Sequence, residues 1–115
     1  MIALFRASVR NALAFVLLAF VAFVPVAAAA PAGHEYVVSM ANMAFGRMPS
    51  GLKVGDSIVF INKDSVPHTV TARDHSFDLR IGPGQRGRLN LTKAGTYQIY
   101  CILHAPMRGT LTVGS

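Results

Sequence analysis

The residues of this chain that could do chemistry gather near its C-terminal end. Cys101, His104 and Met107 follow one another at three-residue intervals, and His68 stands after Pro67, 33 residues before the cysteine. One thiolate, two imidazoles and one thioether form the donor set of a mononuclear electron-transfer copper site. Sulfur donors suit Cu(I) and imidazoles suit Cu(II), so such a site passes an electron with little rearrangement. The spacing predicts that these four residues bind one copper ion.

The same residues also allow three other interpretations: a buried structural cysteine, a zinc site and a nucleophilic cysteine–histidine pair. A single cysteine that ends a strand is usually a small buried hydrophobic residue. Zinc is a competing metal, but structural zinc sites use more thiolates, and methionine is not one of the usual zinc ligands. A nucleophilic cysteine–histidine pair needs a third group to orient the imidazole, and the segment from Cys101 to Met107 contains no Asp or Asn. Copper is the interpretation that gives the thioether a role. His34 and His75 are weaker ligand candidates.

The first 32 residues have the pattern of a secretory signal peptide. Arg6 and Arg10 precede a long apolar run, which ends in an alanine cluster with A-x-A spacing. Cleavage after Ala29 and cleavage after Ala32 both fit. An uncleaved anchor is the alternative, because the apolar run is long enough to cross a bilayer. In both cases the arginines stay inside, so we expect a periplasmic or otherwise extracytoplasmic domain.

The remaining segment, 33–115, is long enough for one small domain. A domain of this size is marginally stable without a staple, and Cys101 alone cannot form an internal disulfide. A bound metal is the other common staple. The formal charge of +6 falls to about +4 without the two leader arginines. The basic residues are spread out and form no helical array, which argues against nucleic acid and favours an acidic protein partner or an anionic membrane surface.

Short β-branched or aromatic runs separated by Gly, Pro, Asn and Asp predict an all-β sandwich or barrel. Polar and apolar residues alternate over 86–91, as in a half-buried strand, whereas 57–62 is apolar on both faces, as in a central strand. The expected strands are 35–40, 52–54, 57–62, 68–71, 77–79, 86–91, 95–101 and 110–113, and the ligands after Cys101 are expected in a loop.

The mature chain resembles the cupredoxins, specifically the plastocyanin/amicyanin family of small blue copper proteins. The resemblance rests on the segments 54–56, 62–70, 77–78, 82–84, 95–97 and 100–107, the last with the short amicyanin-like spacing Cys-x-x-His-x-x-Met. It implies a Greek-key β-sandwich in which His68, Cys101 and His104 are equatorial ligands and Met107 is axial. It also implies that His104 reaches the surface and that the backbone N–H of Thr69 donates to the Cys101 sulfur.

One departure from the family pattern concerns Thr69. Many relatives carry Asn at this position, which leaves open whether the Thr69 side chain ties the ligand loop. A second departure is the pair Ile102-Leu103, which replaces a more polar pair and makes the surroundings of His104 more apolar.

Two functions are compatible with these residues. The first is a one-electron carrier, not an enzyme, that acts as a monomer between redox proteins such as a c-type cytochrome and a dehydrogenase or oxidase. The second is a copper-binding or copper-trafficking protein without a carrier role.

Overall fold

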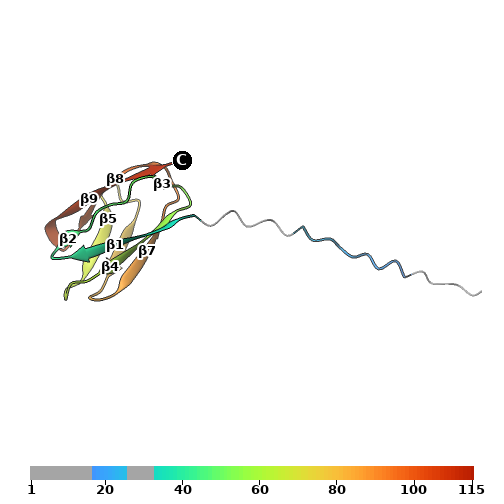
Figure 1. Ribbon diagram of the computed structural model, residues 1–115, viewed down its shortest axis with the longest axis horizontal. Helices are drawn as coiled ribbons and strands as arrows, with labels where there is room; N and C mark the ends of the chain where they lie inside the picture. Colours follow the sequence, from blue (N-terminus) through green and yellow to red (C-terminus); the bar gives the residue numbers. More distant parts are fainter. Residues whose placement is uncertain (1–16, 26–32) are drawn as a thin grey trace, which may run out of the picture.

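The computed structural model describes residues 17–25 and 33–115 (Figure 1). The predicted signal peptide therefore lies largely outside the described residues, and 17–25 contains neither helix nor strand. The described residues contain no helix at all, and hence none that is long and apolar enough to cross a membrane. The prediction of an all-β domain is confirmed.

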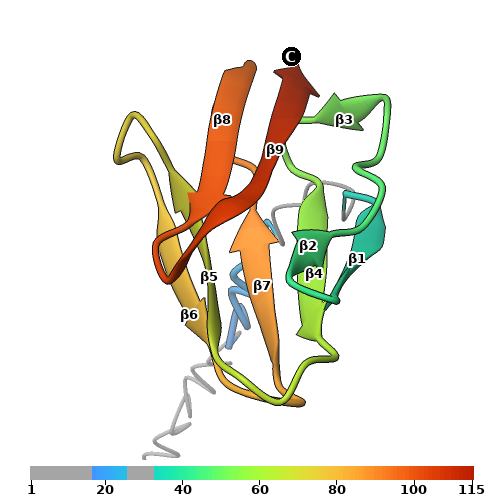
Figure 2. The ribbon, with the colours of Figure 1, turned by 90° about the vertical axis from the view of Figure 1, so that its left-hand side faces the viewer.

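The described part of the chain forms nine strands in two sheets that face each other (Figures 1 and 2). The four-stranded sheet has the order β2 (Ala44–Phe45), β1 (Glu35–Ala41), β4 (Ser57–Asn62), β7 (Arg86–Asn90). The five-stranded sheet has the order β3 (Leu52–Lys53), β9 (His104–Gly114), β8 (Gly95–Cys101), β5 (His68–Ala72), β6 (Asp78–Ile81). Two strand pairs are parallel, β1 with β4 and β3 with β9, and the others are antiparallel.

The core lies between the sheets and follows from the side-chain alternation of the strands. β4 and β5 are almost wholly buried, whereas β1, β7 and β8 bury alternate residues. Phe60, Ile58, Ile99 and Leu111 are completely buried and belong to one hydrophobic cluster, which also contains Cys101. Because the cysteine is part of this cluster, the core holds it in place from one side.

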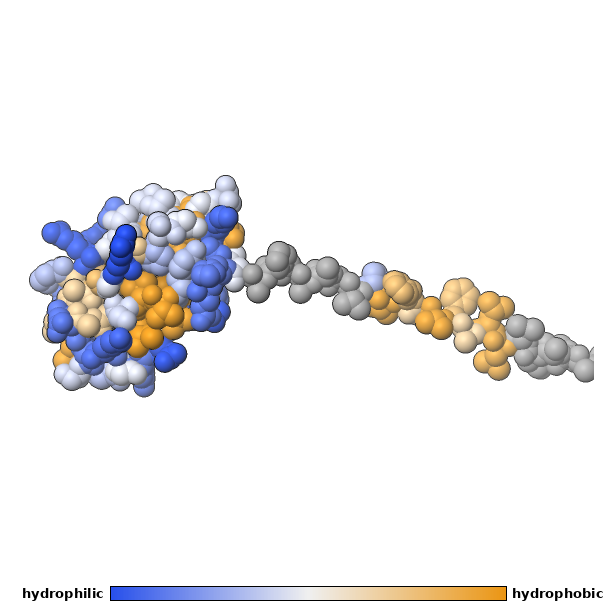
Figure 3. Space-filling view, viewed as in Figure 1, coloured by the Kyte–Doolittle hydropathy of each residue, from blue (hydrophilic) through white to orange (hydrophobic). Residues whose placement is uncertain are grey.

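The outer face of the four-stranded sheet carries some apolar surface. Figure 3 shows an apolar area surrounded by hydrophilic residues on this side of the molecule. Val37 of β1 is 59% exposed and pairs with Val59 of β4. At the edge of this area the Arg88 guanidinium forms an ion pair with Glu35.

The observed strands differ most from the predicted ones at two places, and the other bounds agree to within two residues. The two-residue strand β2 is too short to give a periodic signal, and no strand is expected there. The last strand begins at His104 rather than at Thr110, because only Ile102 and Leu103 form the turn after β8. The expected ligand loop is therefore mostly the irregular start of a strand.

Candidate metal centre

Three of the predicted ligands lie together at one end of the sandwich, the end that faces the viewer in Figure 2. One ligand atom from each of His68, Cys101 and His104 lies within 4.8 Å of the other two. His68 comes from the first position of β5, and the other two come from the end of β8 and the start of β9. The three residues can hold one metal ion, and no other such cluster occurs among residues 17–25 and 33–115.

A buried amide shapes the connection that delivers His68. Asn62, at the end of β4, is fully buried, and its Nδ2 donates to the carbonyl oxygens of Val66 at 2.7 Å and Ile81 at 3.1 Å. Its Oδ1 accepts the backbone N–H of Asp64 at 2.9 Å. Three hydrogen bonds from one side chain fix the five-residue connection, and Pro67 restricts the backbone just before His68. His68 is therefore presented by a rigid support.

Asp64 orients the His68 ring. Its Oδ2 lies 2.7 Å from His68 Nε2, and the carboxylate also accepts the backbone N–H groups of Asn42 at 2.8 Å and Met43 at 3.0 Å. Because an ionised carboxylate only accepts, the proton of the neutral ring resides on Nε2. Nδ1 then carries the free lone pair that could bind a metal, and it lies 3.9 Å from Cys101 Sγ. The hydrogen bond from His68, followed by that from Met43, lowers the pKa of Asp64.

Thr69 forms hydrogen bonds both to Cys101 and to the residue that follows it. The Thr69 backbone N–H donates to Cys101 Sγ at 3.3 Å, the contact that the family resemblance implies. The Thr69 Oγ1 accepts the backbone N–H of Ile102 at 2.8 Å. Threonine at this position thus ties the segment that follows the cysteine, which answers the question that its difference from asparagine raised.

A large bulge at the start of β9 places the remaining candidates. Tyr100 pairs with Arg108, whereas the next residue, Cys101, pairs with His104. Residues 105–107 therefore have no partner on β8, and this departure from the ladder lets the backbone turn. Pro106 lacks an N–H, which suits a position outside the ladder. Met107 in this bulge is only 1% exposed and belongs to the same core cluster as Cys101.

The two histidines differ in their access to solvent. His68 is completely buried, whereas His104 is partly exposed, and their rings meet edge to face with centroids 5.1 Å apart. Beside His104, the turn exposes Ile102 by 54% and Leu103 by 43%. His104 is therefore partly open to solvent beside the apolar rim that Ile102 and Leu103 form, whereas His68 is enclosed.

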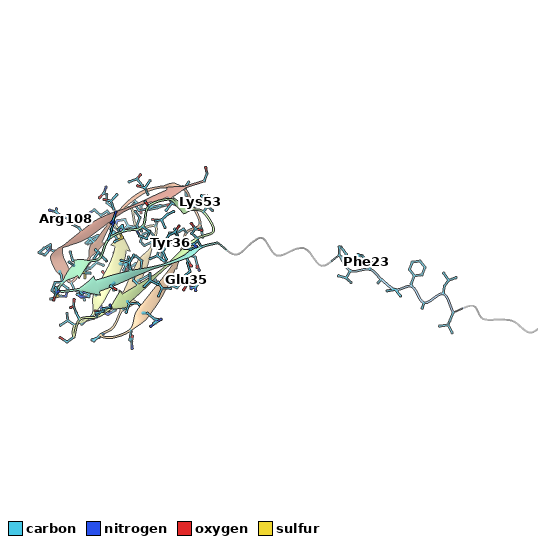
Figure 4. All side chains as sticks on the ribbon, viewed as in Figure 1. Phe23, Glu35, Tyr36, Lys53 and Arg108 are labelled. Atoms are coloured by element: carbon cyan, nitrogen blue, oxygen red, sulfur yellow. The ribbon has the colours of Figure 1, made fainter. Side chains whose placement is uncertain are left out.

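Positive charge borders this end of the sandwich. Arg108 is exposed, and Figure 4 shows it on the opposite side of the folded domain from Glu35. It pairs across the ladder with Tyr100, and the guanidinium of Arg73 lies 4.4 Å from the centre of that tyrosine ring. The outer face of the five-stranded sheet is thus basic beside the cluster.

Sequence reasoning missed Asn62 and Asp64 as supporting residues of the site. The segment Asn62-Lys63-Asp64 reads as an ordinary turn, and a contact four residues ahead to a buried histidine leaves no periodic signal. The weaker candidates His34 and His75 are exposed and lie outside the metal-binding cluster.

Comparisons with known proteins agree with this geometry. The family model of the cupredoxin-like domain matches residues 13–113. The amicyanin of Paracoccus denitrificans is 36% identical over 95 residues, which cover 77% of this chain and 72% of the relative. Among solved structures, the Cu(I) form of a methionine-to-alanine variant of amicyanin has a TM-score of 0.60 at 32% identity, with 69% of this chain and 81% of that chain covered.

A second solved structure agrees with the first. The reduced state of a proline-to-phenylalanine variant of amicyanin has a TM-score of 0.59 at 33% identity, with the same two coverages. The family match covers most of the chain, and the relative exceeds 30% identity over most of both sequences. The chain belongs to the cupredoxin-like family and is of the amicyanin type.

Proposed function

We propose that this protein is a type 1 copper protein that carries single electrons between redox partners outside the cytoplasm. The observation that carries the proposal is the meeting of His68, Cys101 and His104 at one end of a rigid sandwich. The donor set fits copper, because a buried thiolate with two imidazoles and a thioether accommodates both of its oxidation states. In this proposal Met107 is the weak axial ligand.

Copper supplies the one-electron couple, and the chain supplies the rest. His68 would bind through Nδ1, since its Nε2–H donates a hydrogen bond to the Asp64 carboxylate. The N–H of Thr69 withdraws density from the Cys101 sulfur and so tunes the reduction potential. His104, partly exposed within the apolar rim, is the edge through which electrons enter and leave.

The burial pattern favours a carrier over a copper-delivery protein. Cys101 is completely buried and Met107 nearly so, whereas delivery to another protein needs ligands that an acceptor can reach. The basic face around Arg108 and Arg73 matches a redox partner with an acidic surface, such as a c-type cytochrome or a dehydrogenase. We further propose that residues 1–32 form the signal peptide and that 33–115 is a monomeric carrier domain without enzymatic activity.

Metal loading tests the copper site. The purified domain with one equivalent of Cu(II) should be intensely blue, and Cys101→Ser should remove the colour, whereas His75→Asn should keep it. Met107→Leu should also keep the colour and should raise the potential, because loss of a weak axial donor disfavours Cu(II). A pale wild-type protein with an ordinary tetragonal EPR signal would refute the type 1 assignment.

Electrochemistry tests the carrier role. The copper-loaded protein should give a reversible one-electron wave in cyclic voltammetry. A protein that binds copper but shows no reversible wave would instead be a copper-handling protein. N-terminal sequencing of the protein exported by cells would show whether cleavage occurs after Ala29, after Ala32 or not at all.

A further inference from the structure

The five-stranded sheet contains a chain of side-chain hydrogen bonds that leads from its edge to the cysteine. Asp78 is exposed on the edge strand β6, and its Oδ1 lies 2.7 Å from Thr71 Oγ1 on β5. Thr71 Oγ1 lies 3.0 Å from Thr69 Oγ1, which in turn lies 2.8 Å from the backbone N of Ile102. Both threonines are only 4% exposed.

The chemistry of the four groups gives this chain one direction. The Asp78 carboxylate can only accept, so Thr71 must donate its single hydroxyl proton to Asp78. Thr71 Oγ1 can then only accept from Thr69, so the Thr69 hydroxyl proton is also used. Only lone pairs of Thr69 Oγ1 remain for the N–H of Ile102. The carboxylate thus sets the orientation of two buried hydroxyls and polarises the bond to Ile102.

The hydrogen bond from the Ile102 N–H to Thr69 Oγ1 lies just beyond the end of the regular pairing between β5 and β8. The β5–β8 ladder pairs Ala72 with Ile99 and Thr71 with Tyr100, and it ends there. Beyond it, Thr69 forms hydrogen bonds to both Cys101 and Ile102, through its backbone N–H and its Oγ1. The other β5 group near this segment is His68 Nδ1, 3.9 Å from Cys101 Sγ, which does not contact Ile102. The hydroxyl of Thr69 therefore replaces a ladder hydrogen bond at the residue after the cysteine.

We propose that Asp78 is a positioning residue for the Cys101 thiolate, acting through Thr71 and Thr69. When the chain is intact, Ile102 is held against β5 and the Thr69 N–H stays aimed at the sulfur. When it is broken, the segment after Cys101 moves off β5 and that N–H···S contact loosens. The positioning of the segment after Cys101 can be tested in the protein without metal, whereas the effect on the reduction potential rests on the proposed copper function.

Amide hydrogen exchange of Ile102 in the metal-free protein tests the structural part. Thr71→Val removes the hydroxyl without a change of charge and should speed exchange at Ile102 about fivefold, the effect of losing one typical hydrogen bond. Thr71→Ser restores the hydroxyl and should return exchange to the wild-type rate. Asp78→Asn should speed exchange, whereas Asp74→Asn, which removes the same charge from the adjoining turn, should not.

A double-mutant cycle and the reduction potential complete the test. Asp78→Asn should have no further effect on Ile102 exchange once Thr71 is Val, because the two residues act through one chain. In the copper protein, Thr71→Val should lower the potential relative to Thr71→Ser, since a weaker N–H···S bond favours Cu(II). Equal exchange in the Val and Ser variants, or additive effects of the two substitutions, would overturn the proposal. A protein that fails to bind copper would refute the proposed function but would leave the exchange test intact.

Discussion

Copper should stabilise the fold strongly, and His68→Ala should abolish most of that stabilisation. The ligand atoms of His68, Cys101 and His104 already lie within 4.8 Å of one another, so the native state offers a preformed site. The unfolded chain has one cysteine and no fixed geometry, so it binds copper less tightly. A ligand at a thousandfold excess over its Kd adds about 4 kcal/mol to the free energy of unfolding.

This free energy converts into a large shift of the melting temperature. A domain of 60–100 residues gains about 4–8 °C per kcal/mol, so copper should raise Tm by roughly 15–30 °C. Copper bound to the unfolded chain would place the shift at the lower end of this range. The copper-induced stabilisation should be largest when all four proposed donors are present.

Differential scanning calorimetry with and without copper measures the effect. The quantity to compare is the copper-induced shift of each variant, because His68→Ala also leaves a cavity and lowers the Tm of the metal-free protein. His75→Asn is the matched control, since His75 is exposed and has a positive φ of 66° that asparagine tolerates. A copper shift in His68→Ala as large as that in the wild type would refute the assignment of His68 to the site.

Of three further predictions, one concerns a residue that supports the site and two concern residues that stabilise the fold. Asp64→Asn should raise the reduction potential more than Asp74→Asn does, as measured by redox titration. The reason is that a carboxylate that accepts a hydrogen bond from the Nε2–H makes the His68 ring a better donor to Cu(II). Hydrogen bonds from the backbone N–H of Lys53 and then of His34 lower the pKa of Asp56. The stability that this carboxylate contributes is therefore present at neutral pH and is lost as the pH falls through the lowered pKa. The urea midpoints at neutral and acidic pH should differ less in Asp56→Asn than in the wild type. Ile99→Ala, at a fully buried position, should cost about 2–5 kcal/mol in urea unfolding and leave the blue colour intact.

The strands that could be predicted are those whose pattern is set by burial on the sheet. The segments 57–62 and 95–101 are observed with the predicted bounds, because continuous or alternating apolar residues between turn signals leave few other solutions. The start of β9 could not be predicted, since Pro106 between the polar or charged His104 and Arg108 is typical of a loop, although the backbone pairs again at His104. Strand pairing is decided by the partner strand and not by the local sequence.

At the site, too, the candidate ligands could be predicted from the sequence, whereas the residues that support them could not. The candidate donors Cys101, His104 and Met107 were indicated by their residue types and three-residue spacing, and His68 by its type and its place after Pro67. Their support is made of common residues, and its role depends on the meeting of distant segments: Asp64 joins the turn at Asn42 to His68, and Thr69 joins β5 to Ile102. No local pattern distinguishes an aspartate that orients an imidazole from one that ends a turn.

The bulge at residues 105–107 makes the spacing of the candidate ligands adjustable independently of the sandwich. An insertion there would lengthen the path from His104 to Met107 while every pair from Arg108 onward keeps its partner on β8. Closing a slightly longer loop costs little entropy. An insertion one position before Cys101 would instead reverse the inward and outward faces at the end of β8 and expel the thiol from the core. Natural length variation should therefore concentrate in these three positions, where a new metal geometry can arise without a new framework.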